Sequence, residues 1–253
     1  NTQSLRRTNY SHASIDEYNR RQLLPAPLRF TVQEMTLTAD MVNQHFERIN
    51  ALSGQIDMLE NTAIATPTSR SQYRPTNIAT PTSSDLHREA PTTRLSAAYM
   101  ARAIEFALVQ DYSSAIDDAT RATLLDGTLY FAYFCRANWR YKLLEYRRAM
   151  GEKTEGADFE LMMRDYDYVI DHVPDFSFAY YNKANMLCIQ QDFRAAIRYY
   201  TQAIAVDSDF AEAYFNRGLT HIFIDEVEEG LADLSKAGEL GIYQAYNLIS
   251  RFQ

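Results

Sequence analysis

The strongest constraint on the fold of this chain is a recurrence of similar residues at a fixed spacing within residues 96–253. Tyrosines recur at separations of 34, 47 and 34 residues, at Tyr99, Tyr133, Tyr180 and Tyr214. Small residues recur at the same separations, at Ala103, Ala137, Ala184 and Gly218. A second series has separations of 47, 34 and 34 residues, at Ala115, Met162, Ala196 and Gly230. The shared period of 34 predicts a stacked array of similar units, with a 13-residue insertion between Ala137 and Met162.

Two stretches show the repeated unit most clearly. Residues 179–209, "AYYNKANMLCIQQDFRAAIRYYTQAIAVDSD", read as helix, turn and helix, with Asp192-Phe193 at the turn and Ala196, Tyr200 and Ala203 on the second helix. Residues 99–126, "YMARAIEFALVQDYSSAIDDATRATLLD", follow the same pattern. These residues resemble the tetratricopeptide repeat (TPR) family, whose unit is an antiparallel helix pair of this length. Residues 211–242 depart from the family pattern, because they have Glu226-Val227 at the turn and Gly230 in an alanine position.

The resemblance implies an all-α fold for residues 96–253, a right-handed α-solenoid of about four helix pairs with a C-terminal capping helix. We expect that cap at residues 243–252, after the helix stop at Gly241. The insertion continues the apolar stripe of the preceding helix through Leu143, Tyr146 and Met150. It therefore predicts a helical hairpin near residues 142–158, either as a decoration or as one wall of a binding site.

Residues 1–60 read as a small separate segment in front of the array. Leu28, Phe30 and Val32 alternate with polar residues, which predicts a short strand at residues 28–37. Thr38 can cap a helix at residues 39–60, where apolar residues recur at three- and four-residue steps. We expect this helix to pack against the rest of the chain, with His45 as a packing residue; a short coiled-coil seam is the alternative.

Residues 61–95 have the composition of an extended linker. The hexapeptide "IATPTS" occurs twice, at 64–69 and 78–83, in a tract rich in Thr, Pro and Ser. Such a tract has too few large apolar residues to offset the entropy lost on ordering. A modified Ser/Thr stalk and a docking strip are the functional alternatives.

The charge distribution argues against nucleic-acid binding. The chain has a net charge of −8, and residues 96–253 hold 15 basic against 24 acidic residues. An array of that charge repels phosphate backbones. No apolar run reaches the roughly 20 residues that a membrane span requires. The chain begins at Asn1 without a Met, which we interpret as a processed protein or a fragment. The sequence does not identify the compartment of the protein. The family resemblance alone favours an exported or periplasmic protein over a cytoplasmic one.

The sequence contains no recognisable catalytic, cofactor or metal motif. The five histidines have no ligand spacing, and the two cysteines, Cys135 and Cys188, lie apart in predicted helices and read as small buried residues. The acidic run from Asp165 to Asp175 spreads around its helix instead of converging. We therefore predict a protein that is not an enzyme and binds no cofactor or metal; an enzyme with an unrecognised site is a remote alternative.

The family resemblance also implies where a partner binds. In TPR arrays the first helices of successive units line the concave face, where partner peptides usually bind. The positions of this sequence that match that face are Phe134, Asn138, Tyr141, Tyr181, Asn182, Asn185, Phe215 and Asn216. An asparagine amide both donates and accepts, which suits the N–H and C=O groups of an extended peptide. The alternative is that these asparagines bond only to neighbouring helices or to water.

The predicted partner is a neutral to basic extended protein segment, either of another protein or of the chain's own linker. A well-known TPR subgroup grips a terminal carboxylate with lysine, arginine and asparagine, but the positions here that match its lysines hold Met100, Phe134, Tyr181 and Phe215. We therefore predict a non-catalytic interaction scaffold that does not bind carboxylate tails. The alternative is a structural part of a larger repeat assembly that makes contacts through its convex face or the inserted hairpin.

Overall fold

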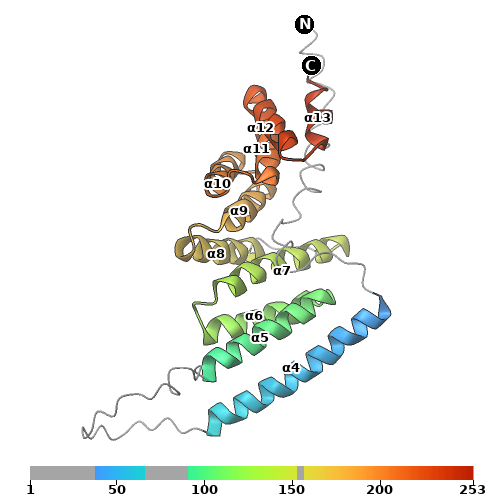
Figure 1. Cartoon of the computed structure of the whole chain (residues 1–253), viewed down its shortest axis with the longest axis vertical. Helices are drawn as coiled ribbons and strands as arrows, with labels where there is room; N and C mark the ends of the chain where they lie inside the picture. The colour runs from blue at the N-terminus through green and yellow to red at the C-terminus, as the bar shows by residue number, and fades with distance from the viewer. Residues whose placement is uncertain (1–37, 66–90, 153–156, 253) are drawn as a thin grey trace, which may run out of the picture. The chain divides into compact units, whose positions relative to one another are not determined.

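The computed structural model describes residues 38–65, 91–152 and 157–252. These residues form ten helices and no strand, so the predicted all-α class is confirmed for them (Figure 1). The predicted strand at residues 28–37 lies outside the described residues. The chain divides into two compact units at Met150–Gly151.

The first unit contains four helices that pack in chain order: α4 (Ala39–Ala65), α5 (Pro91–Leu108), α6 (Tyr112–Leu125) and α7 (Tyr130–Ala149). Its inner positions include the alanines of the repeat, and Ala103, Ala115 and Ala137 are fully buried. Small side chains at these positions let neighbouring helices approach closely.

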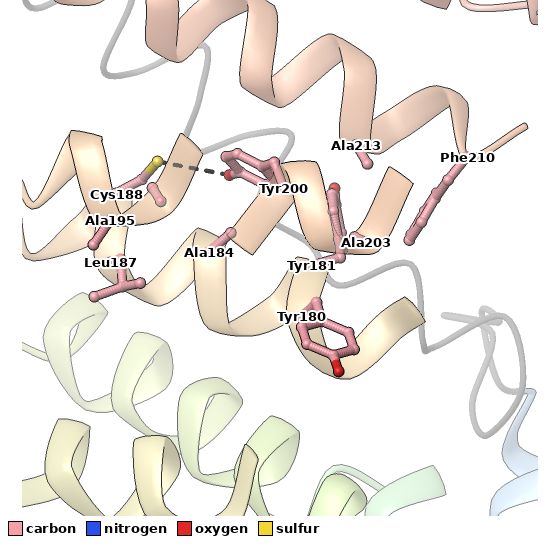
Figure 2. Close-up of a cluster of buried hydrophobic side chains, with 11 residues drawn as sticks. Tyr180, Tyr181, Ala184, Leu187, Cys188, Ala195, Tyr200, Ala203, Phe210 and Ala213 are labelled. Atoms are coloured by element: carbon pink, nitrogen blue, oxygen red, sulfur yellow. Dashed lines mark hydrogen bonds between the residues drawn. The ribbon is translucent and has the colours of Figure 1, made fainter. Parts of the chain in front are cut away.

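The second unit contains six helices: α8 (Ala157–His172), α9 (Ser177–Ile189), α10 (Phe193–Val206), α11 (Ala211–Phe223), α12 (Val227–Glu239) and α13 (Gln244–Ile249). Each helix packs against the next one along the chain. One apolar cluster joins α9 and α10 to the start of α11, with Tyr181, Ala184, Tyr200, Ala203 and Ala213 at its centre (Figure 2). A second cluster joins α11, α12 and α13.

The turns inside the helix pairs repeat one backbone conformation. Gln110, Gln191 and Asp225 each have a positive φ, between 63° and 72°. An aspartate then caps the second helix in two of these turns. The Asp111 side chain accepts from the Ser114 N–H, and the Asp192 side chain accepts from the Ala195 N–H. These turns reverse the chain, so the two helices of each pair run antiparallel.

The helix ends differ from the predicted boundaries at three places. Helix α4 continues to Ala65 and α5 begins at Pro91, so both ends of the predicted linker, 61–65 and 91–95, are helical. Proline is well tolerated at the first helical position, where its missing N–H costs nothing. Helix α13 ends at Ile249 instead of 252, because Arg251 and Phe252 form tighter hydrogen bonds to carbonyls three residues back.

The inserted region is partly described. Helix α7 runs on through the insertion as far as Ala149, which makes it 20 residues long, whereas α9 and α11 have 13 each. Helix α8 begins at Ala157, and residues 153–156 lie outside the described residues.

Candidate functional site

The eight residues predicted to bind a peptide lie on three helices in two units. Tyr181, Asn182 and Asn185 are on α9, and Phe215 and Asn216 are on α11. Phe134, Asn138 and Tyr141 are on α7, which belongs to the other unit. All eight are buried, and none is more than 3% exposed. They therefore do not form an open surface, and their polar groups must be accounted for inside the structure.

A hydrogen-bonded pair of asparagines joins α9 and α11. Asn216 Nδ2 donates to Asn185 Oδ1 at 3.0 Å and to the Tyr181 hydroxyl at 2.9 Å. The Tyr200 hydroxyl of α10 donates to the same Asn185 Oδ1 at 2.6 Å. Four side chains from three helices thus meet at one carboxamide oxygen and one carboxamide nitrogen.

A second branch of this network runs through Cys188. Its Sγ lies 3.6 Å from the Tyr200 hydroxyl oxygen (Figure 2) and 3.4 Å from Thr220 Oγ1. The Thr220 hydroxyl donates to the Asn216 backbone carbonyl at 2.7 Å, and Tyr200 donates to Asn185. With both hydroxyl protons used in these bonds, the single S–H of Cys188 can donate to one of the two hydroxyl oxygens. Both cysteines are buried, as expected from the sequence, and neither is in a disulfide.

Aromatic rings pack against Tyr181, which accepts a hydrogen bond from the asparagine pair. The Tyr181 ring lies 4.8 Å from that of Phe210 and 5.9 Å from that of Tyr200. Burial raises the pKa of the Tyr200 hydroxyl well above its ordinary value, because the phenolate would lose its hydration. Tyr200 is therefore a neutral donor to Asn185 at any ordinary pH.

Two atoms of the asparagine pair have no hydrogen-bond partner. They are Asn185 Nδ2 and Asn216 Oδ1, and both are buried in the described part of the second unit. An unmade hydrogen bond on a buried polar atom costs about 1–3 kcal/mol. The pair therefore has one open donor and one open acceptor, and a group that supplied the complementary acceptor and donor would remove this cost.

The basic residues of α9 and α11 are already engaged with other groups. Lys183 pairs with Asp167 and donates to the Tyr199 hydroxyl at 2.7 Å. Burial lowers its pKa, but the bonds to Asp167 and Tyr199 outweigh burial, so the pKa is raised overall. Arg217 makes two 2.7 Å bonds to the Asp233 carboxylate and a third to Thr201.

These two residues belong to a series that our sequence analysis missed. Basic residues recur at the repeat spacings of 34, 47 and 34, at Arg102, Arg136, Lys183 and Arg217. Each bonds to a side chain on the preceding helix, at Ser53, Thr120, Asp167 and Thr201 respectively. Their regular spacing was the available signal, and it indicates a structural role in joining neighbouring helices.

In residues 38–65, 91–152 and 157–252, no group of three or more His, Cys, Asp or Glu side chains is arranged to hold a metal ion. Within the same ranges, no helix has the length and apolar character that crossing a membrane requires.

Comparisons with known proteins agree with the repeat pattern. A family model described as "TPR repeat" matches residues 184–222, which include both asparagines of the pair. A crystal structure of MamA is similar with a TM-score of 0.54 at 14% identity, over 84% of this chain and 99% of that one. A second MamA structure has a TM-score of 0.53 at 13% identity, over 83% and 96% of the two chains. At these identities the likeness concerns the fold alone. No curated protein matches the chain significantly.

Proposed function

Because this chain is a member of the tetratricopeptide repeat family, we propose that it binds an extended segment of a partner protein on the first helices α9 and α11. TPR arrays are protein–protein interaction scaffolds and are typically not catalytic. The binding mode is the part that we propose, and the open donor and acceptor of Asn185 and Asn216 support it.

An extended peptide has the groups that this pair lacks. Its backbone presents unpaired N–H and C=O groups along both edges, as a strand at the edge of a sheet does. A backbone carbonyl can accept from Asn185 Nδ2, and a backbone N–H can donate to Asn216 Oδ1. Because both atoms are buried, the covering side chains must open before the segment enters, and we expect slow association.

The charge of the second unit supports a neutral to basic partner. Residues 157–252 hold 7 Lys and Arg against 16 Asp and Glu. A partner segment with arginines or lysines beside its contact residues is attracted by this unit, whereas an acidic segment is repelled.

Peptide-display panning against the full chain tests this proposal. The Asn185→Ala variant removes the open donor, and Asn247→Ala on the exposed surface of α13 is the matched control. We expect enriched peptides that bind the native chain and the control equally but bind Asn185→Ala at least about tenfold more weakly. Circular dichroism establishes that each variant is folded. Peptides that bind all three proteins equally, or no enrichment on a folded array, would overturn the proposal.

A second candidate function has one observation in its favour. Tyr146 and Met150, one helical turn apart at the end of α7, are 61% and 66% exposed. Exposed large apolar side chains on a projecting helix end are typical of contact surfaces. If the chain is a structural part of a larger repeat assembly, Tyr146 and Met150 would be the contact residues of its inserted region. Loss of self-association or partner capture in a Tyr146→Ser/Met150→Ser variant, with peptide binding unchanged, would favour this alternative.

A further inference from the structure

We propose that the face of α5 covered by α4 is a docking surface for a helix, and that α4 of a second copy of this chain can occupy it. The inference goes beyond the proposed function, because it concerns the first unit and an association between copies. Helix α4 takes the place of a repeat helix in the stack, yet it packs on one side only.

Helix α4 contacts α5 as the second helix of a preceding repeat would. Arg102 of α5 donates from Nη1 to Ser53 Oγ of α4 at 2.9 Å. Arg217 of α11 donates from Nη1 to Thr201 Oγ1 of α10 at the same distance, 2.9 Å. Each arginine also makes two hydrogen bonds to an aspartate 16 residues further along the chain. Helix α4 therefore packs on α5 as α10 packs on α11.

Two further polar contacts make this interface specific for α4. The Glu105 carboxylate of α5 lies 2.6 Å from His45 Nδ1 and 3.6 Å from Arg48 Nη1, both on α4. The Tyr99 hydroxyl of α5 donates to the Glu60 carboxylate of α4. The positions that match Glu105 in the later first helices hold Trp139, Met186 and Thr220. Those positions offer no carboxylate, so the imidazole and guanidinium of α4 fit α5 and not its counterparts.

The contact of α4 is one-sided. Its buried residues His45, Ile49 and Ile56 recur on one face, whereas Phe46 and Met58 are 49% and 72% exposed. Helices α6 and α10 each pack between two neighbours, but among the described residues α4 packs principally against α5. A helix held on one face by few apolar side chains separates from its neighbour more readily than one packed between two.

The length of chain between the two helices lets α4 reach a second copy. The 25 residues 66–90 join α4 to α5, and an extended chain of that length spans at most about 80 Å. The contacts of α4 with α5 can form within one chain or between two, because both copies present identical surfaces. Docking within one chain has the higher effective concentration. Exchange is therefore expected where copies are held close together, or where a chain's own α4 cannot dock.

A labelled peptide of residues 38–65 tests the docking surface on the full chain. In Ile49→Asp/Ile56→Asp the buried apolar residues of α4 become charged, so the chain's own α4 leaves α5 uncovered. We expect this variant to bind the peptide at least about tenfold more tightly than the native chain, whose α4 competes. Phe46→Asp/Met58→Asp is the matched control and should bind as weakly as the native chain, because both residues are exposed. Fluorescence anisotropy measures the binding.

A pair of full-length variants tests the second copy. Glu105→Arg places a cation opposite His45 and Arg48, so its α5 rejects α4 while its own α4 is intact. Mixed with Ile49→Asp/Ile56→Asp, it is expected to form an equimolar complex in sedimentation velocity that neither variant forms alone. An excess of the peptide should dissociate this complex.

Circular dichroism establishes that each variant is folded. If Ile49→Asp/Ile56→Asp is not, His45→Ala/Glu60→Gln takes its place in both experiments, because it removes polar contacts of α4 and leaves the apolar ones. Equal peptide binding by this variant and the native chain would overturn the docking surface. So would undiminished binding of a peptide that itself carries the Ile49→Asp and Ile56→Asp changes. Peptide binding without a complex between the two full-length variants would overturn the exchange between copies.

Discussion

The Tyr200 hydroxyl is the residue-scale feature that connects the stability of the fold to the candidate site. It donates to Asn185 Oδ1, lies beside the Cys188 thiol, and is fully buried on α10. Asn185 Oδ1 accepts two hydrogen bonds, one from Tyr200 and one from Asn216 Nδ2. Without the Tyr200 hydroxyl it would keep only the second. The hydroxyl therefore stabilises the fold and also orients the asparagine that we propose to bind the partner.

We predict that Tyr200→Phe lowers the free energy of unfolding by about 1–2 kcal/mol at neutral pH, because it leaves a buried hydrogen bond unmade. We also predict a difference in alkaline solution. In the unfolded chain Tyr200 ionises near its ordinary pKa of 10.0, whereas burial raises the pKa in the folded protein. The unfolded chain thus loses its proton first, and the contribution of Tyr200 to stability is lost as the pH rises above about 10.

Urea unfolding across this pH range measures both effects. The native protein is expected to lose stability more steeply above about pH 10 than Tyr200→Phe does. Tyr243→Phe is the control, because Tyr243 is 75% exposed. Equal pH dependence of the native protein and Tyr200→Phe would show that the hydroxyl is not buried as described.

At the scale of elements, the crossing of α11 and α12 depends on two glycines. A Cβ on Gly230 would lie 2.5 Å from Ile222 Cγ1 and 2.6 Å from the Gly218 carbonyl oxygen. Alanine fills the equivalent positions in α6 and α10, at Ala115 and Ala196. Helices α11 and α12 thus approach so closely at this point that a Cβ on Gly230 would clash, which is a steric reason for the departure from the family pattern.

We predict that Gly230→Ala destabilises the second unit by about 1–3 kcal/mol, because the added methyl group meets a backbone oxygen that cannot move aside cheaply. Gly54→Ala is the matched control. Gly54 lies within α4 with no atom within 4 Å of a Cβ, so alanine there is expected to stabilise by about 0.5–1 kcal/mol. Thermal unfolding followed by circular dichroism measures both. A neutral or stabilising Gly230→Ala would contradict the close crossing.

At the scale of the whole molecule, the asparagine pair and its supporting network lie entirely in the second unit. Their residues come from α9, α10 and α11, whereas the predicted residues Phe134, Asn138 and Tyr141 are on α7 of the first unit. The proposed binding therefore needs only the second unit's own helices, and the first unit is free to serve another purpose.

Hydrogen exchange of the full chain, with and without a peptide enriched by panning, tests this division. We expect slower exchange in Ser177–Ile189 and Ala211–Phe223, because a bound segment suppresses the opening of the side chains that cover the pair. Exchange in α4 and α5 is expected to stay the same. Slower exchange confined to Tyr130–Ala149 would instead place the partner on the extended α7.

Much of the fold was predictable from the repeat spacing together with the family resemblance that it supports. The recurrence of Ala103, Ala137, Ala184 and Gly218 identifies the helix pairs, since every unit needs a small residue where its helices cross. The helical ends of the predicted linker were missed. Composition describes the average of a tract and does not locate the ends of its helices, whereas in the structure Pro91 begins a helix and α4 extends to Ala65.

For the candidate site, the sequence predicted which residues take part but not how they are bonded or buried. The family resemblance assigns Asn185 and Asn216 to the face where a partner binds, and the sequence alone determined that three of the four repeats carry an asparagine on that face, at Asn138, at Asn182 and Asn185, and at Asn216. The tertiary structure decided that the two amides bond to each other, with Tyr200 and Tyr181 as their partners, and that all of them are buried. A repeat period fixes a position to about one helical turn. A hydrogen bond depends on distances of about 3 Å, which only the packing of three helices sets.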